Sequence, residues 1–238
     1  TANAENLLVT EIHYHPADAS TAEELAVSTN KDDYEFLELL NTSGNEIDLS
    51  DYQFTRGLTF IFPQGSTIAP RARRIIVSNR QAFLARYGIE NEAIILGEFD
   101  RDSNLSNGGE TLELRDSKDN LVFSFQYNDK SPWPTAPDGL GPSLYLVSAS
   151  TPSSQLGEAE RWQASNVPNG TPGFETKLSY TQWAKQTYGS PTTPGSSPGD
   201  IANGTSDSNL VLYAQGADLT NKVVRQASFM TVNDELLA

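Results

Sequence analysis

The sequence predicts an all-β protein, either a sandwich or a barrel, over most of its length. Between Leu7 and about Val147, short apolar, β-branched and aromatic runs alternate with Gly, Pro, Asn and Asp, as expected for many short strands joined by turns. The chain has 238 residues, enough for one domain with a buried core and an appendage. It contains no cysteine, so disulfides and thiolate chemistry are both excluded.

The predicted strands follow one another at short intervals. In chain order they cover residues 7–14, 34–40, 58–63, 73–78, 93–99, 111–115, 121–127 and 144–147. Residues 111–115 and 121–127 read as a hairpin, in which Leu112 and Leu114 alternate with Glu113 and so turn one face inward. The preceding Asn107, Gly108 and Gly109 permit the positive φ angles of a sharp turn.

One segment departs from the strand pattern. Residues 79–88 place Phe83, Leu84 and Tyr87 at helical spacing, with Asn79 as the N-cap and Gly88 as the C-terminal stop, which predicts a short helix. Residues 28–33, by contrast, are polar and predict a mobile loop.

After Phe174 the composition changes. Residues 178–189 read as an amphipathic helix, and residues 190–200 form a linker of Pro, Gly and Ser that cannot pack. The remaining tail is too small to hold a core alone. We therefore expect a domain of residues 1–176 followed by residues 177–238 as a helix, linker and flexible C-terminal segment.

The charge excludes some partners. Asp and Glu number 31 against 16 Lys and Arg, a formal net charge of -15, so the summed field repels phosphate backbones and anionic lipids. We expect no nucleic acid partner. No apolar run is long enough to cross a bilayer, and we expect no membrane insertion.

Several stretches occur in an order that resembles one known family. They are EIHYHP (11–16), YEFLELLN (34–41), IDLSDYQF (47–54), FIFPQGSTIAP (60–70), LSNGGETLEL (105–114), PWPTAPDGLGPSLYLV (132–147) and RWQASNVPNGTPGF (161–174). Together they resemble the lamin-tail domains of bacterial secreted and surface proteins, over roughly residues 7–174.

The resemblance implies an immunoglobulin-like β-sandwich without catalytic activity, usually one module of a larger exported protein. Such a module serves binding, attachment or the presentation of neighbouring domains. We therefore expect a non-enzymatic interaction, adhesion or spacer module, secreted or at the cell surface of a bacterium and part of a larger multidomain protein. The sequence does not say whether its partner is a protein or a polysaccharide.

A transition-metal site is one alternative source of chemistry. Glu11, His13 and His15 share one strand face because side chains alternate along a strand, and imidazole groups bind zinc when further ligands converge. This face is the hypothetical centre of a metal-dependent hydrolase. The competing interpretation is a hydrogen-bonded or exposed histidine pair, since no HExxH motif is present.

The acidic loops suggest a second possible cofactor. Asp32 and Asp33, together with Asp100 and Asp102, could supply oxygen ligands to a surface calcium ion. The ordinary interpretation is that they are solvated loop acids. Glu35 and Glu38 lie on opposite faces of their strand unless a bulge intervenes, so they do not form a paired acid and base.

Two tryptophans are candidate ligand-binding residues. Trp133, between two prolines, and Trp162 lie next to turn-rich loops and could stack on a sugar ring or a peptide. The sequence thus leaves open a carbohydrate-binding module with loop calcium. In a sandwich, however, such residues more often close the end of the core.

Overall fold

The structure is a computed structural model that describes residues 2–100, 102–174, 197 and 200. The predicted helix at residues 178–189, the linker and the C-terminal tail lie outside these residues. The division of the chain at residue 176 therefore stays a prediction.

Six strands form the larger sheet. In spatial order they are β12 (Trp162–Ala164), β11 (Leu144–Leu146), β1 (Leu7–His13), β2 (Phe36–Asn41), β7 (Arg73–Val77) and β8 (Ile95–Glu98). All neighbouring pairs are antiparallel except β7 and β8, which are parallel. Because parallel neighbours need a crossover connection, helix α2 (Arg80–Tyr87) lies between them in the chain.

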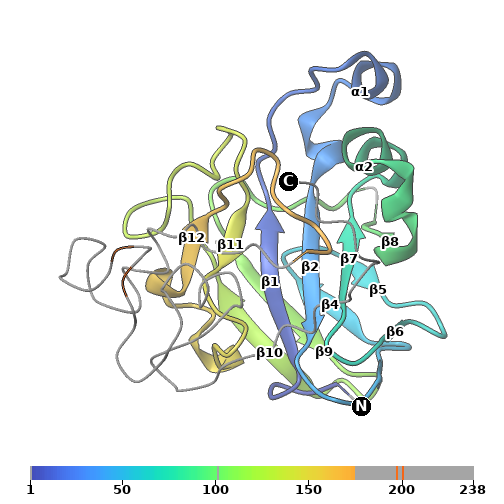
Figure 1. The fold of residues 1–238 in the computed structure, drawn as a ribbon. Helices are drawn as coiled ribbons and strands as arrows, with labels where there is room; N and C mark the ends of the chain where they lie inside the picture. The colour runs from blue at the N-terminus through green and yellow to red at the C-terminus, as the bar shows by residue number, and fades with distance from the viewer. Residues whose placement is uncertain (1, 101, 175–196, 198–199, 201–238) are drawn as a thin grey trace, which may run out of the picture. The chain divides into compact units, whose positions relative to one another are not determined.

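The second sheet packs against the first. Its order is β10 (Leu121–Gln126), β9 (Thr111–Arg115), β4 (Gln53–Arg56) and β5 (Phe60–Ile61), and a small pair is formed by β3 (Ile47–Asp48) and β6 (Thr67–Ile68). Figure 1 shows β4, β9 and β10 behind β1 and β2. One hydrophobic cluster draws side chains from both sheets, so the predicted immunoglobulin-like all-β sandwich is confirmed.

The helical prediction is confirmed but incomplete. Asn79 caps α2 by accepting a hydrogen bond from the Ala82 N–H, and Gly88 ends the helix at φ 93°. A further helix, α1 (Ala22–Val27), begins at a capping box between Thr21 and Glu24. Short 3₁₀ helices occur at η1 (Lys31–Tyr34), η2 (Ile89–Ile94), η3 (Ser153–Gln155) and η4 (Ala159–Arg161), and η1 replaces part of the loop expected at residues 28–33.

Strands β1 and β2 are buried on both faces along their whole length. Their inner face contributes Ile12, Leu37 and Leu39 to the core between the sheets. On the outer face, Phe36 packs against Phe83 and Tyr87 of α2, with ring centroids 6.0 and 5.8 Å apart. Because the core lies on one face of β1 and β2 and α2 packs on the other, neither face is open to solvent.

The second cover of the outer face is the segment after β12, residues 167–174, which we call the strap. It crosses β1 and β2 as the orange segment in Figure 1.

Among the described residues, no helix has the length and apolar character that a membrane span requires.

Candidate functional site

Two buried glutamates hold the strap on the sheet. Glu11 of β1 and Glu38 of β2 are register partners, and both side chains are fully buried. The N–H of Thr171 donates to Oε1 of Glu11 at 2.8 Å, and the N–H of Gly173 donates to Oε2 of Glu38 at 2.7 Å. The strap thus satisfies its backbone donors on carboxylates from two neighbouring strands.

The remaining contacts of the two glutamates differ, because only one of them has a cationic neighbour. Glu11 also accepts a hydrogen bond from the Ser143 hydroxyl, whereas Oε1 of Glu38 accepts one from the Thr10 hydroxyl and lies 3.0 Å from Nε of Arg73. Burial, followed by the charge of Glu38, raises the pKa of Glu11, and burial also raises the pKa of Glu38 against the lowering effect of Arg73. We infer that Glu38, beside the guanidinium, carries the negative charge when Glu11 is protonated.

A close approach at Gly170 lets the strap reach Glu11. A Cβ atom at this position would lie 2.2 Å from Oε1 of Glu11 and 2.7 Å from the Ser143 hydroxyl, and the residue has φ 82°. The preceding Asn169 also has positive φ, at 66°, and its carbonyl accepts a hydrogen bond from the Tyr87 hydroxyl at 2.6 Å. Only glycine combines this conformation with this approach.

His13 lies beneath the same outer cover. It is 1% exposed and stacks on Phe36 with ring centroids 5.4 Å apart, and neither ring nitrogen has a hydrogen-bond partner among the described residues. Burial, then the nearby Arg86 and His15 charges, lower its pKa to about 3. The imidazole is therefore neutral at physiological pH.

His15 follows the end of β1 and is held differently. Its Nδ1 lies 2.5 Å from Oδ1 of Asp138, and its Nε2 lies 2.5 Å from Nζ of Lys31. A lysine ammonium can only donate, so Nε2 is the acceptor and Nδ1–H donates to the carboxylate. The imidazole thereby links η1 to the loop that contains Asp138.

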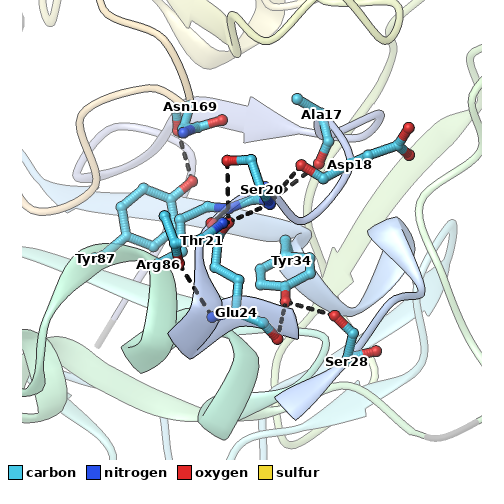
Figure 2. A network of polar contacts seen from close by, with 10 residues as sticks. All are labelled: Ala17, Asp18, Ser20, Thr21, Glu24, Ser28, Tyr34, Arg86, Tyr87 and Asn169. Carbon is cyan, nitrogen blue, oxygen red and sulfur yellow. Dashed lines mark hydrogen bonds and ion pairs between the residues drawn. The ribbon is translucent and has the colours of Figure 1, made fainter. Parts of the chain in front are cut away.

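A buried ion pair joins the two helices (Figure 2). Nε of Arg86 on α2 lies 2.6 Å from Oε1 of Glu24 on α1, and the guanidinium stacks 3.8 Å above the Tyr34 ring. Arg86 also donates to the Ala17 carbonyl at 3.0 Å. Burial would raise the pKa of Glu24, but hydrogen bonds from Ser20, Arg86 and Thr21 outweigh it and lower the pKa to about 2.

The three residues predicted as transition-metal ligands are engaged separately. Glu11 binds the strap, His13 stacks on Phe36, and His15 bridges Lys31 and Asp138. Among the residues that the structure describes, no group of three or more His, Asp or Glu side chains is arranged to hold a metal ion. The structure therefore does not bring this predicted ligand set together.

The four predicted calcium ligands are also distributed. Asp32 and Asp33 belong to η1, where Oδ1 of Asp32 is buried without a partner among the described residues. Asp100 is a backbone turn residue whose carbonyl accepts from the Ser103 N–H at 2.8 Å. Asp102 lines a polar depression beside residues 103–110.

The tryptophans differ in their exposure. Trp162 is 4% exposed, stacks on Phe125 and donates its indole N–H to the Leu156 carbonyl at 2.7 Å. The Trp162 ring thus lies against other aromatic rings, and its role as a ligand-binding residue stays a prediction. Trp133 is half-buried, 6.3 Å from the Trp162 ring, and its role in ligand binding stays a prediction.

The Glu11 and Glu38 pair and the Glu24 and Arg86 pair were not anticipated from the sequence. Its one signal was the presence of glutamates inside the apolar runs of residues 7–14 and 34–40. Because both members of the first pair are fully buried and hydrogen-bonded, the arrangement fits structural acceptors rather than groups that meet a substrate. Glu35 and Glu38 have separate partners, the former accepting from the Leu105 N–H.

Comparison with models of known protein families identifies a match. The model of the family described as Lamin Tail Domain matches residues 1–129, more than half of the chain. No curated protein sequence matches.

The close approach at Gly170 predicts the cost of a single methyl group. We expect Gly170→Ala to lower the free energy of unfolding by about 3 kcal/mol, because positive φ and overpacking each cost about 1–2 kcal/mol. Gly65→Ala is the matched control, since Gly65 has φ 83° with nothing within 4 Å of an added Cβ. Urea denaturation of both variants measures the difference, and equal losses would contradict the proposed contact.

Because the His13 imidazole is buried, we expect an acid limb, meaning a fall in the free energy of unfolding as the pH decreases. The ordinary pKa of His13 is 6.5 and the folded value is about 3, so the unfolded chain binds a proton that the folded chain refuses. Its contribution is complete above pH 6.5 and is lost as pH falls towards 3, by about 1.4 kcal/mol per pH unit. His13→Phe, which keeps a ring against Phe36, should flatten this limb in urea denaturation at several pH values. An unchanged limb would show that His13 is not its source.

The ion pair between the helices predicts strong coupling. Arg86→Met leaves the buried Glu24 without its cation and should cost about 3–5 kcal/mol, whereas Glu24→Met combined with Arg86→Met should recover most of this loss. A double-mutant cycle by urea denaturation measures the coupling. Additive losses in the double variant would argue against a buried, interdependent pair.

Proposed function

Because the chain belongs to the lamin tail domain family, whose members are immunoglobulin-like interaction modules without catalytic activity, we propose that it is an interaction and spacer module of an exported bacterial protein. The family relation supports the general role. The exported and bacterial setting rests on the resemblance of the ordered sequence stretches to secreted and surface proteins.

The observation that carries the proposal is that the buried ionisable side chains make their contacts inside the protein and do not face solvent. Glu11 and Glu38 are fully buried and bind the strap, and His13 is 1% exposed beneath α2. A general base must reach the proton that it removes from a substrate. Groups enclosed in this way support a structural module more than a hydrolase.

The net charge limits the class of molecule that can be the binding partner. The excess of 15 negative charges supports a protein or polysaccharide partner, because anionic nucleic acids and lipids are repelled. Trp133 is the observation that favours a polysaccharide, since its indole is only half-buried. Binding of polysaccharides that disappears in Trp133→Ala would identify this second candidate function.

Exposure to the exterior of the cell is the first outcome to measure. In the source bacterium, protease added to intact cells should digest this chain while a cytosolic marker survives. The purified chain should not hydrolyse ester, phosphoester or peptide substrates, with or without added Zn²⁺ or Mg²⁺. Protection from the protease would contradict export, and metal-dependent turnover that is lost in His15→Gln would replace the proposal by a hydrolase.

A further inference from the structure

His15 joins three segments of the chain. It follows β1, its Nδ1 lies 2.5 Å from Oδ1 of Asp138, and its Nε2 lies 2.5 Å from Nζ of Lys31. Lys31 begins η1, which leads into β2, and Asp138 belongs to the connection between β10 and β11. The imidazole therefore links the end of β1 to two connections that are far apart in the sequence.

The two sides of the imidazole are held differently. On the Asp138 side, the Gly139 N–H also donates to the His15 carbonyl at 3.2 Å, and a Cβ atom added at Gly139 would lie 3.1 Å from the ring Cε1. On the other side, the described residues show no backbone hydrogen bond between η1 and His15. The hydrogen bond from Lys31 is therefore what joins η1 to this ring.

The Lys31 contact requires a neutral imidazole. An ammonium group can only donate, so Nε2 must offer its lone pair. When the ring takes up a proton, both nitrogens become donors, and Nε2–H then faces a like charge 2.5 Å away. The contact with Asp138 instead becomes a hydrogen bond between opposite charges. Protonation thus strengthens one contact of the ring and breaks the other.

Solvent protons can reach this ring, because the His15 side chain is 16% exposed and that of Asp138 is 41% exposed. Imidazole is the side-chain group that ordinarily changes charge between about pH 5 and 8. The charged groups that face the ring are Asp138 and Lys31. Its titratable neighbour on β1, His13, is neutral because burial lowers its pKa to about 3.

Lys31 has no acidic partner to compensate for the loss of the imidazole. Within the described part of the chain, it forms no ion pair with Asp or Glu. Asp32 and Asp33 directly follow it in the sequence and offer carboxylates to a freed ammonium. Release of Lys31 from His15 therefore gives the ammonium a new place close by.

We propose that His15 is a pH-sensitive switch, whose protonation releases Lys31 and η1 while the contact with Asp138 is kept. In the neutral state the ring joins η1 to the connection between β10 and β11, and in the protonated state it holds the connection alone. The anchor of α1, the ion pair of Glu24 with Arg86, does not involve His15. The change is therefore confined to η1.

An NMR titration of the intact chain from about pH 8 to pH 5 tests the switch. The chain has two histidines, and His13 stays neutral in this range, so the imidazole signal that titrates belongs to His15. We expect the Cε and Nζ signals of Lys31 to move with the same midpoint. The exposed Lys118 and Lys130 are the controls, and their signals should not follow this midpoint.

Hydrogen exchange measures the release of η1. The N–H groups of Asp33 and Glu35 each donate to the backbone carbonyl three residues earlier, at 3.2 Å. After correction for the intrinsic pH dependence, their exchange should become about tenfold faster on protonation of His15, within the 5–150-fold range typical of coupled sites. The Leu25 N–H, bonded within α1 at 3.0 Å, should show no such change.

Two variants separate the charge of the ring from its contacts. In His15→Gln, the amide group can donate to Asp138 and accept from Lys31 but takes up no proton, so both pH-dependent changes should disappear. Lys31→Met removes the ammonium that protonated His15 would repel. Its η1 should exchange at the fast rate at both ends of the titration.

Three outcomes would overturn the proposal. In the first, His15 titrates while the Lys31 signals and the exchange of η1 stay unchanged. In the second, the pH-dependent release persists in His15→Gln. Should that variant fail to fold, a pH-dependent exchange of η1 that persists in Lys31→Met would overturn it equally. None of these results bears on the interaction role of the module, which protease exposure and activity assays test separately.

Discussion

The outer face of the central strands depends on one constraint, the satisfaction of two buried carboxyl groups on adjacent strands. Glu11 and Glu38 sit side by side in the β1 and β2 register, where water cannot reach them. The strap supplies the N–H groups of Thr171 and Gly173 at this point, and Arg73 supplies a charge. Without the strap, two carboxyl groups and the backs of two strands would meet solvent or lose their donors.

The same outer face also explains the role of α2. Its Phe83 and Tyr87 cover Phe36, while Tyr87 reaches on to the Asn169 carbonyl of the strap. Arg86 on the same helix faces α1 and binds Glu24. The helix therefore connects the strap, the sheet and α1, which makes the outer layer one interdependent unit.

The buried acids divide into two electrostatic classes. Glu24 is surrounded by donors and a guanidinium, and its pKa falls. Glu11 and Glu35 have fewer compensating partners, and burial raises the pKa of each. For these two, the folded state binds protons that the unfolded state releases above pH 4.5, so their contribution to stability is complete below that value and is lost as pH rises towards the raised pKa values. His13 has the opposite effect, because its contribution to stability is lost as the pH falls. The free energy of unfolding therefore decreases at both low and high pH.

The sequence by itself determined the class of fold, eight of the strands, the capped helix after Asn79 and the family resemblance, because alternation, turn residues and caps are local properties. It did not predict the short strands β3, β4, β6 and β12. Helix α1 was not predicted, although Thr21 and Glu24 fit the pattern of a capping box, because that helix is short and surrounded by polar residues. Only the tertiary structure decided the partners of the acids. Strand register placed Glu11 beside Glu38, and the return of the chain over β1 and β2 placed residues 171–173 on both. Local sequence carries no signal for contacts between residues so far apart in the chain, and burial of a polar group depends on what later segments cover.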